Sequence, residues 1–286
     1  MSCPASISPA TRTMTSNQPI GVFDSGLGGL SVLRDIRALM PSEDVRYYAD
    51  NAYCPYGLRS PAEIQARSIA VAGLLLDQGA KAIVVACNTA SAMAINEVRA
   101  RYPGVPIVGL EPAVKPAVKL TKSGRVGVLA TPRTVAGERL RWLIETYAGD
   151  VQVHTVAAAG LVELVESGTL SGSEVVATLR PMLDPMIDAG VDVVVLGCTH
   201  YPYLRAEIEV YMGPGVPVID SGVAIARRVR DVLASHGLLT ASTGEGALSL
   251  MTSGEAAIVE PVAQFLIGED VPVTTVQTSH AILDCA

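Results

Sequence analysis

Short apolar runs alternate with longer amphipathic segments along most of the chain. The runs typical of buried strands form two sets of four, at residues 20–26, 45–50, 81–89 and 105–112, and then at 125–131, 151–157, 191–200 and 216–222. After the first run, Leu30, Leu33, Ile36 and Met40 form one apolar helical stripe, and Pro41 is expected to stop that helix. The alternation predicts an α/β fold built from βαβ units around parallel sheets.

The segment at residues 60–79 has residues typical of the start and the end of a helix. Ser60 is the expected N-cap, Pro61 lies in the first turn, and Glu63 completes a capping box. Gly79 follows the last apolar position, where a glycine commonly ends a helix. This segment is therefore expected to be helical and to separate the second and third strands.

The two sets of strands resemble each other, which indicates an internal repeat. "IVVACNTA" at 83–90 matches "VVVLGCTH" at 193–200 in character, and the offset between Cys87 and Cys198 equals that between Val105 and Val216. The repeat predicts two pseudo-symmetric domains, each a mainly parallel sheet flanked by helices. A last helix and two strands, near 247–253 and 271–276, are expected to return to the first domain. The expected domains are residues 20–110 plus 221–286, and residues 111–220.

Composition narrows the class of protein. The chain has 286 residues, 49% of them hydrophobic, a formal net charge of −7 and a sequence pI of about 5.1. The acidic balance argues against nucleic acid as a partner, and no apolar run approaches the roughly 18 residues of a membrane span. Residues 1–19, rich in Ser, Thr and Pro, are expected to be a disordered leader rather than a secretory signal. A cytoplasmic location is expected.

A glycine-rich turn, "DSGLGG", follows the first strand. Its glycines, Gly26, Gly28 and Gly29, do not fit G-x-G-x-x-G, and the chain contains no P-loop motif. Asp24 and Ser25 lie where the carboxyl end of a strand meets the amino end of a helix, a geometry suited to a small anion. A dinucleotide is therefore not expected here.

Two of the five cysteines occupy equivalent places in the repeat. Cys87 and Cys198 each follow a buried strand and precede a helix, so both are expected at the ligand-binding edge of a parallel sheet. A helix amino terminus also favours a reactive thiolate. Cys3 and Cys285 are interpreted as ordinary thiols, and Cys54 as a structural residue. An odd number of cysteines does not indicate a disulfide framework.

Three chemistries compete for these thiols. A zinc site could use Cys198 and His200 with Asp24 or Cys87, but the chain has no C-x-x-C or H-x-x-x-H pair. A Cys–His nucleophile would leave Cys87 without a role. Two thiols on opposite faces of a carbon centre instead suit inversion, in which one takes a proton and the other returns one. Asp24 beside Cys87 and His200 beside Cys198 could hold the thiol protons.

Four motifs together carry a specific resemblance. "GVFDSGLGGLSVL", "DNAYCPYG", "ACNTAS" and "GCTHYP" occur in this order, and the chain resembles the glutamate racemases of bacterial cell-wall synthesis from about Ile20 to its last strands. The resemblance implies two pseudo-symmetric α/β domains, no cofactor, no metal and a homodimer. The implied activity interconverts L- and D-glutamate and supplies D-glutamate for peptidoglycan.

The resemblance also implies roles for individual residues. Cys87 and Cys198 are the expected catalytic acid/bases, assisted by Asp24 and His200. Glu166 matches a glutamate that assists the second thiol in some relatives, although Glu163 is an alternative and the usual Cys-Pro before it is missing. The expected substrate contacts are Asp24, Ser25, Tyr56, Gly57, Asn88, Thr89, Thr199 and His200, and the "DSGLGG" turn is expected to hold a carboxylate or ammonium group of the amino acid.

Two alternatives remain open at this point. One is another two-thiol racemase, acting on aspartate or a hydantoin, because substrate length is not read from these motifs. The other is a module that binds an amino acid between two lobes without converting it. The two symmetrically placed thiols favour an enzyme.

Overall fold

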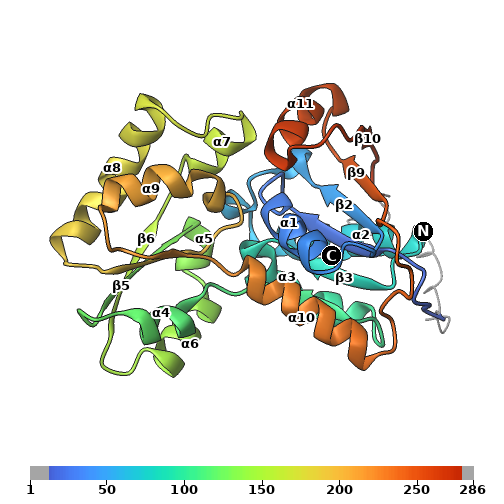
Figure 1. Cartoon of the computed structure of the whole chain (residues 1–286), viewed down its shortest axis with the longest axis horizontal. Helices are drawn as coiled ribbons and strands as arrows, with labels where there is room; N and C mark the ends of the chain where they lie inside the picture. Colours follow the sequence, from blue (N-terminus) through green and yellow to red (C-terminus); the bar gives the residue numbers. More distant parts are fainter. Residues whose placement is uncertain (1–12, 279–286) are drawn as a thin grey trace, which may run out of the picture.

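Two parallel sheets form the framework of the protein, one in each of two lobes that lie side by side (Figure 1). A computed structural model describes residues 13–278. The first sheet has the order β10 (Val273–Thr275), β9 (Leu248–Thr252), β2 (Val45–Ala49), β1 (Ile20–Asp24), β3 (Ala82–Val85), β4 (Ile107–Gly109). The second has the order β6 (Gln152–Ala157), β5 (Arg125–Ala130), β7 (Val193–Leu196), β8 (Val218–Ile219). The α/β fold expected from the sequence is confirmed.

The strand order of one sheet recurs in the other. The series β2-β1-β3-β4 in the first sheet corresponds to β6-β5-β7-β8 in the second, and every pairing within both series is parallel. The pseudo-symmetry predicted from the repeat is therefore present in the topology. Because β3 and β7 are equivalent, the residues that follow them, Cys87 and Cys198 among them, also lie at equivalent places.

Helices cover both faces of each sheet, which explains why the central strands are apolar on both sides. In the first lobe, α1 (Leu30–Leu39), α10 (Gly222–Ser235) and α11 (Ala256–Ile267) cover one face, and α2 (Pro61–Asp77) and α3 (Asn88–Arg101) cover the other. In the second lobe, α7 (Leu161–Glu166), α8 (Ser173–Asp188) and α9 (Arg205–Met212) oppose α4 (Val114–Leu120) and α6 (Glu138–Tyr147). The short α5 (Pro132–Val135) follows β5.

Successive side chains of β7 point to opposite faces of the sheet and pack against different helices. Val193 and Val195 belong to the cluster under α4 and α6, whereas Val194 and Leu196 belong to the cluster under α8 and α9. All four side chains are buried. A strand of period two thus contributes to both cores.

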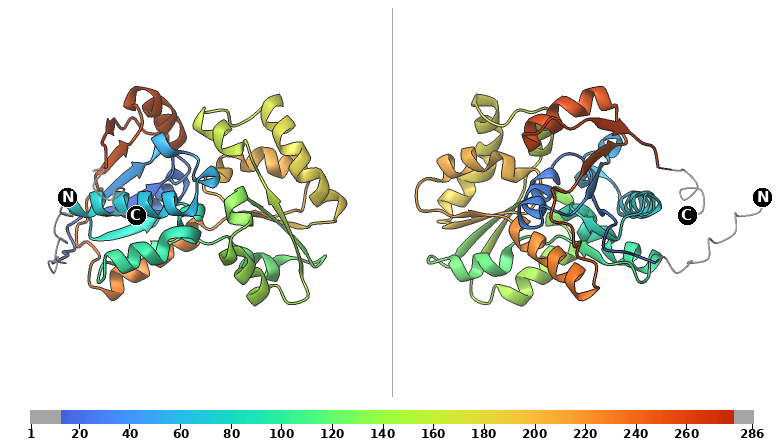
Figure 2. Two further views of the ribbon diagram at one scale, coloured as in Figure 1. Left: turned by 180° about the vertical axis from the view of Figure 1, so that it is seen from behind. Right: turned by 45° about the vertical axis from the view of Figure 1, so that its right-hand side comes forward.

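The last part of the chain completes the first lobe. Strand β9 pairs with β2, β10 pairs with β9, and α10 packs on α1. The view from behind shows these red and orange elements on the same lobe as the blue amino-terminal strands (Figure 2). The chain therefore crosses between the lobes twice, after β4 and after β8.

The prediction of a disordered leader is wrong for residues 13–19. The backbone amide of Lys81 donates to the Pro19 oxygen at 2.9 Å, the Lys81 ammonium donates to the Ser16 oxygen, and Met14 packs against the core. The same ammonium pairs with Glu43 at 2.5 Å, and both side chains are almost fully buried. A buried ion pair that also needs a backbone oxygen fixes this segment in place. Residues 1–12 lie outside the described part of the chain.

The local signals of α2 are confirmed. Ser60 and Glu63 form both hydrogen bonds of the capping box, and Gly79, with φ of 89°, follows the helix in the left-handed region. Within residues 13–278, no helix combines the length and the apolar character that a membrane crossing requires.

Candidate active site

Asp24 is the last residue of β1, and its carboxylate caps the turn that follows. One oxygen accepts from the Ser25 amide at 2.7 Å and the other from the Gly29 amide at 2.6 Å. The hydroxyl of Thr199, from the other lobe, donates to Asp24 at 3.2 Å. Burial raises the pKa of Asp24 above its ordinary range, although the charge of nearby His200 opposes the shift. This carboxyl group is therefore a better proton acceptor than an exposed aspartate.

Cys87 is the N-cap of α3 and lies next to Asp24. Its thiol accepts from the Ala90 amide at 3.4 Å and lies 4.0 Å from the Ser25 hydroxyl. Burial first, and the charge of Asp24 second, raise the pKa of Cys87 well above the usual value for a thiol. The resting thiol is protonated and has a carboxylate beside it that can receive the proton.

Cys198 occupies the equivalent place after β7 and has a histidine as its partner. Its sulfur lies 3.7 Å from Nδ1 of His200, and both residues are buried. Burial alone would lower the pKa of His200, but hydrogen bonds to Cys198, Cys54 and Glu166 raise it well above its ordinary value. The two thiols thus have partners of opposite charge, a carboxylate and an imidazolium.

Glu166, rather than Glu163, lies against His200. Its Oε1 is 2.6 Å from Nε2 of His200 and accepts from the Leu27 amide at 2.6 Å. Both glutamates are on α7, but Glu166 ends that helix beside the turn of the first lobe. The sequence left open which of the two glutamates lies beside His200. Their positions on the helix decide it in favour of Glu166.

The "DSGLGG" turn is occupied by the protein itself, which revises its expected role. The amides of Ser25 and Gly29 bind Asp24, the Leu27 amide binds Glu166, and the Gly28 amide points at His200 Nε2 at 3.2 Å. A Cβ at Gly28 would lie 2.2 Å from His200 Nδ1, and one at Gly26 would lie 2.1 Å from a Glu166 oxygen. The turn lies directly against Glu166 and His200 of the other lobe, so the glycines are needed for close approach between the lobes.

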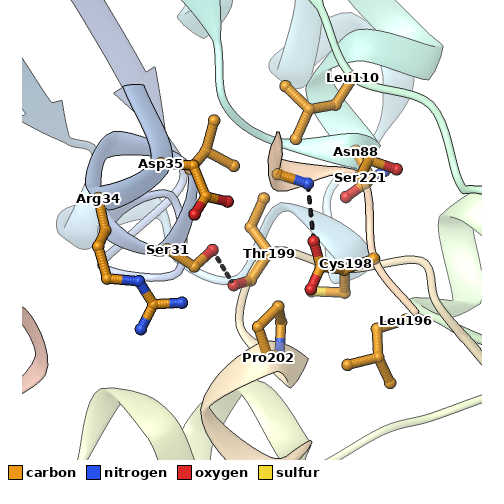
Figure 3. A pocket seen from close by; sticks show the side chains of 13 residues that line it. Ser31, Arg34, Asp35, Asn88, Leu110, Leu196, Cys198, Thr199, Pro202 and Ser221 are labelled. Carbon is orange, nitrogen blue, oxygen red and sulfur yellow. Dashed lines mark hydrogen bonds between the residues drawn. The ribbon is translucent and has the colours of Figure 1, made fainter. Parts of the chain in front are cut away.

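Asn88 and Cys198 line a common pocket between the lobes (Figure 3). The hydroxyl of Ser31 donates to the Thr199 oxygen at 2.9 Å at the edge of this pocket. The side-chain nitrogen of Asn88 is buried and has no hydrogen-bond partner within the described chain. Such a donor carries a desolvation cost that a bound acceptor would remove.

The remaining expected contacts lie where the lobes meet. Thr89 on α3 hydrogen-bonds to Thr131 at 2.9 Å across the interface, and Gly57 packs so closely on Thr131 that a Cβ would lie 2.9 Å from its Cβ. The hydroxyl of Tyr56 donates to Asp50, and Asp50 is held by a bidentate pair with Arg67. Tyr56 is thereby a rigid part of the loop, with its hydroxyl already used inside the first lobe.

Cys54 lies beside Glu166 and His200, although from the sequence it is interpreted as a structural residue. Ligand atoms of Cys54, Glu166 and His200 all lie within 4.8 Å of one another, a set that could hold a metal ion. The zinc set considered from the sequence, built on Cys198, is different. Hydrogen bonds within the chain already account for the Glu166 and His200 positions. Cys3 and Cys285 lie outside the described residues.

Thr131 is not among the site residues predicted from the sequence, although the internal repeat indicates it. Thr131 follows β5 as Ser25 follows β1, and Gly21 and Gly127 align in the two strands. Applying the repeat to each polar residue at a strand end, and not only to the thiols, would have found it. Cys54 lies within "DNAYCPYG", one of the four motifs of the resemblance. Its place in that motif could have indicated that it lies near the site.

The chain is similar to known proteins over most of its length. A family model described as Asp/Glu/Hydantoin racemase matches residues 20–229. The chain is 49% identical over 250 residues to a glutamate racemase of Herpetosiphon aurantiacus, covering 87% of this chain and 98% of that protein. It is 44% identical over 270 residues to one of a Roseiflexus species, covering 94% and 98%.

Solved structures give the same result. The glutamate racemase of Francisella tularensis in complex with D-glutamate has a TM-score of 0.81 and 30% identity, covering 92% of this chain and 99% of that one. The Escherichia coli glutamate racemase, in complex with L-glutamate and the activator UDP-MurNAc-Ala, has a TM-score of 0.80 and 34% identity over the same fractions. The chain therefore belongs to the glutamate racemases of the Asp/Glu/Hydantoin racemase family.

Proposed function

We propose that this protein interconverts L- and D-glutamate without a cofactor and supplies D-glutamate for peptidoglycan. The observation that carries the proposal is the pair of buried thiols, Cys87 and Cys198, at equivalent places in two related lobes. Each has its own proton partner, Asp24 or His200. Relatives that share up to 50% of the aligned residues with this chain are glutamate racemases.

The proton transfers in this proposal balance within the site. One thiol, as thiolate, takes the α-proton of glutamate from one face and becomes neutral. The other thiol donates its proton to the opposite face and becomes the thiolate. Asp24 receives the Cys87 proton when that thiol must act as base, and imidazolium His200 returns a proton to Cys198. Glu166 holds His200 in place for this task.

Substrate binding in this proposal uses the polar groups around the thiols. The unpartnered nitrogen of Asn88 is the strongest candidate donor to a substrate carboxylate. The proposed contacts also include Asp24, Ser25, Tyr56, Gly57, Thr89, Thr199 and His200, with Tyr56 contributing through its backbone because its hydroxyl binds Asp50. Preorganised donors stabilise the carbanion-like charge that forms when a weakly acidic proton leaves.

The decisive experiment follows solvent deuterium into substrate and product. In deuterated water, product from either enantiomer should carry deuterium while recovered substrate initially keeps its protium, because each face has its own acid or base. Single replacement of Cys87 or Cys198 by Ala should abolish racemisation in both directions. Early deuterium in the substrate would indicate a single base, and unchanged optical rotation of D-glutamate would leave a binding module or a racemase of another substrate. D-aspartate tested in parallel separates glutamate from aspartate specificity.

Cofactor independence is tested separately. The purified protein should lack the absorbance of a lysine aldimine and should keep its activity after chelator treatment. Loss of activity in chelator, with recovery on adding zinc, would instead assign the cluster of Cys54, Glu166 and His200 to a metal.

A homodimer in the cytoplasm completes the proposal. Ile258 and Phe265 are 67% and 61% exposed on one side of α11, where a second copy could cover them. Free thiols at Cys54, Cys87 and Cys198 suit a reducing compartment. Light scattering should give twice the chain mass, and Phe265→Glu should lower it toward one chain if α11 lies in the interface.

A further inference from the structure

A chain of hydrogen bonds runs from strand β9 to His200. The Thr252 hydroxyl, fully buried, donates to the side-chain oxygen of Asn51 at 3.0 Å. The side-chain nitrogen of Asn51 donates to Glu166 Oε2 at 2.7 Å. Glu166 Oε1 then meets His200 Nε2 at 2.6 Å. The chain thus links the carboxyl end of the tail strand in one lobe to the acid–base group of the other.

The polarity of this chain follows from a backbone amide. The Gly254 amide donates to the Thr252 hydroxyl at 3.0 Å, so the hydroxyl proton points at the Asn51 oxygen. With that oxygen occupied as acceptor, the amino group of Asn51 must face Glu166. An asparagine amide has distinguishable ends, and here both ends are assigned by their partners.

The two oxygens of Glu166 are consequently used for different purposes. Oε2 accepts from Asn51, while Oε1 accepts from the Leu27 amide and faces His200. A carboxylate group held by two fixed donors is well placed to accept a hydrogen bond from Nε2–H of His200. This leaves Nδ1 of His200 directed at Cys198 at 3.7 Å. The Gly28 amide also points at Nε2, but its 3.2 Å contact is longer than the contact with Glu166.

We propose that Asn51 and Thr252 are positioning residues that hold Glu166, and through it His200, in the orientation that serves proton transfer at Cys198. Among the hydrogen bonds of residues 13–278, neither side chain bonds to Cys87 or Cys198, and Cys87 has its own partner in Asp24. The inference rests on the proposed racemisation and predicts that these residues affect one half of it, the proton transfer on the Cys198 face.

Kinetic isotope effects measured with each enantiomer can show which of the two proton transfers a variant slows. Enantiomers have equal free energy in an achiral solution, so any variant must lower kcat/KM by the same factor for both. Slowing the Cys198 step makes it more rate-limiting. The α-deuterium effect on kcat/KM must then rise for the enantiomer that loses its proton to Cys198 and fall for the other. A general structural defect would not divide the two enantiomers in this way.

The test uses Asn51→Leu and Thr252→Val with both α-deuterated enantiomers of glutamate. Asn51→Leu should lower kcat/KM roughly 10- to 100-fold, the range expected from misplacing a catalytic group. Thr252→Val should lower it about 2- to 10-fold, the equivalent of one hydrogen bond. Both should shift the isotope effects in the same sense as His200→Asn, and Thr252→Ser should restore the parent values.

Thr275→Val is the matched control, because Thr275 pairs in register with Thr252 but donates to the Gly254 oxygen instead. It should keep the parent isotope effects. Thermal melts of all variants identify any loss of folding, and Thr252→Val keeps the test valid if Asn51→Leu does not fold. Isotope effects that stay at parent values, or rise together for both enantiomers, would overturn the inference. A parent protein that does not racemise glutamate would instead overturn the proposed function.

Discussion

At the scale of single residues, the site is an arrangement of buried ionisable groups with unlike partners. Asp24 lies against Cys87, whereas His200 lies against Cys198. A carboxylate beside a thiol disfavours the thiolate, and an imidazolium beside a thiol favours it. One lobe therefore has a protonated thiol beside a carboxylate, whereas the thiol of the other lobe lies beside a cation.

Asp24→Asn should separate the charge effect of Asp24 from its role in proton transfer. Burial and then the Asp24 charge raise the pKa of Cys87 above 9.0, so removing the charge should make thiolate absorbance appear at lower pH. Racemisation should nevertheless fall by about 100-fold or more, because the acceptor of the thiol proton is lost.

Ultraviolet titration of Asp24→Asn against the parent protein measures this shift, and Cys87→Ala assigns the signal. The same raised pKa implies that the fold loses stability as pH rises above 9.0, where the unfolded thiol ionises and the folded one does not. A titration curve unchanged in Asp24→Asn would show that Asp24 does not act on Cys87.

At the scale of elements, the segment before β1 shows how a polar run can be ordered by one buried charge. Lys81 is the residue before β3, and its ammonium lies inside the protein, between Glu43 and the Ser16 oxygen. A buried ammonium needs several acceptors, and the leading segment provides one of them. Composition alone does not reveal this, because the requirement comes from a residue far along the chain.

Deleting residues 2–18 should therefore destabilise the fold. Loss of the Ser16 oxygen removes one hydrogen bond to a buried charge, which is worth about 1.5–3 kcal/mol. Chemical denaturation measures the free energy of unfolding, and deletion of residues 2–12 is the control because it retains the Ser16 oxygen. Equal stability of the two deletions would contradict a structural role for residues 13–18.

At the scale of the whole molecule, the groups that we propose as catalytic also hold the two lobes together. Glu166 and His200 of the second lobe bind the glycine-rich turn of the first, and Thr131 binds Thr89. The position of one lobe on the other therefore decides the geometry of both thiols. A change at this interface should affect activity more than folding.

Gly28→Ala tests this coupling. Its Cβ would lie 2.2 Å from the His200 ring, so the ring or the whole lobe must move. Activity should fall roughly 100-fold, as expected for a misplacement of about 1 Å, with a modest change in melting temperature. Gly244→Ala is the matched control, since its Cβ would have no atom nearer than 3.9 Å. Parent-like turnover of Gly28→Ala would contradict the close approach.

The sequence by itself determined the elements, the repeat and the thiol pair. Periods of two and 3.6 reflect which side of each element is buried, and the Ser60–Glu63 capping box depends only on neighbours along the chain. Cys87 and Cys198 could be found because a strand end in a parallel sheet has a fixed direction, whatever the packing.

Only the tertiary structure decided which groups meet. Glu166 rather than Glu163 contacts His200, the amides of the "DSGLGG" turn bind side chains instead of standing free, and Asn51 joins Thr252 to Glu166. These contacts join residues far apart in the chain, and two of them, Leu27 to Glu166 and Asn51 to Glu166, cross between the two lobes. Local periodicity contains no information on how one lobe sits on another, because that arrangement is set by packing and by the pairing of buried polar groups.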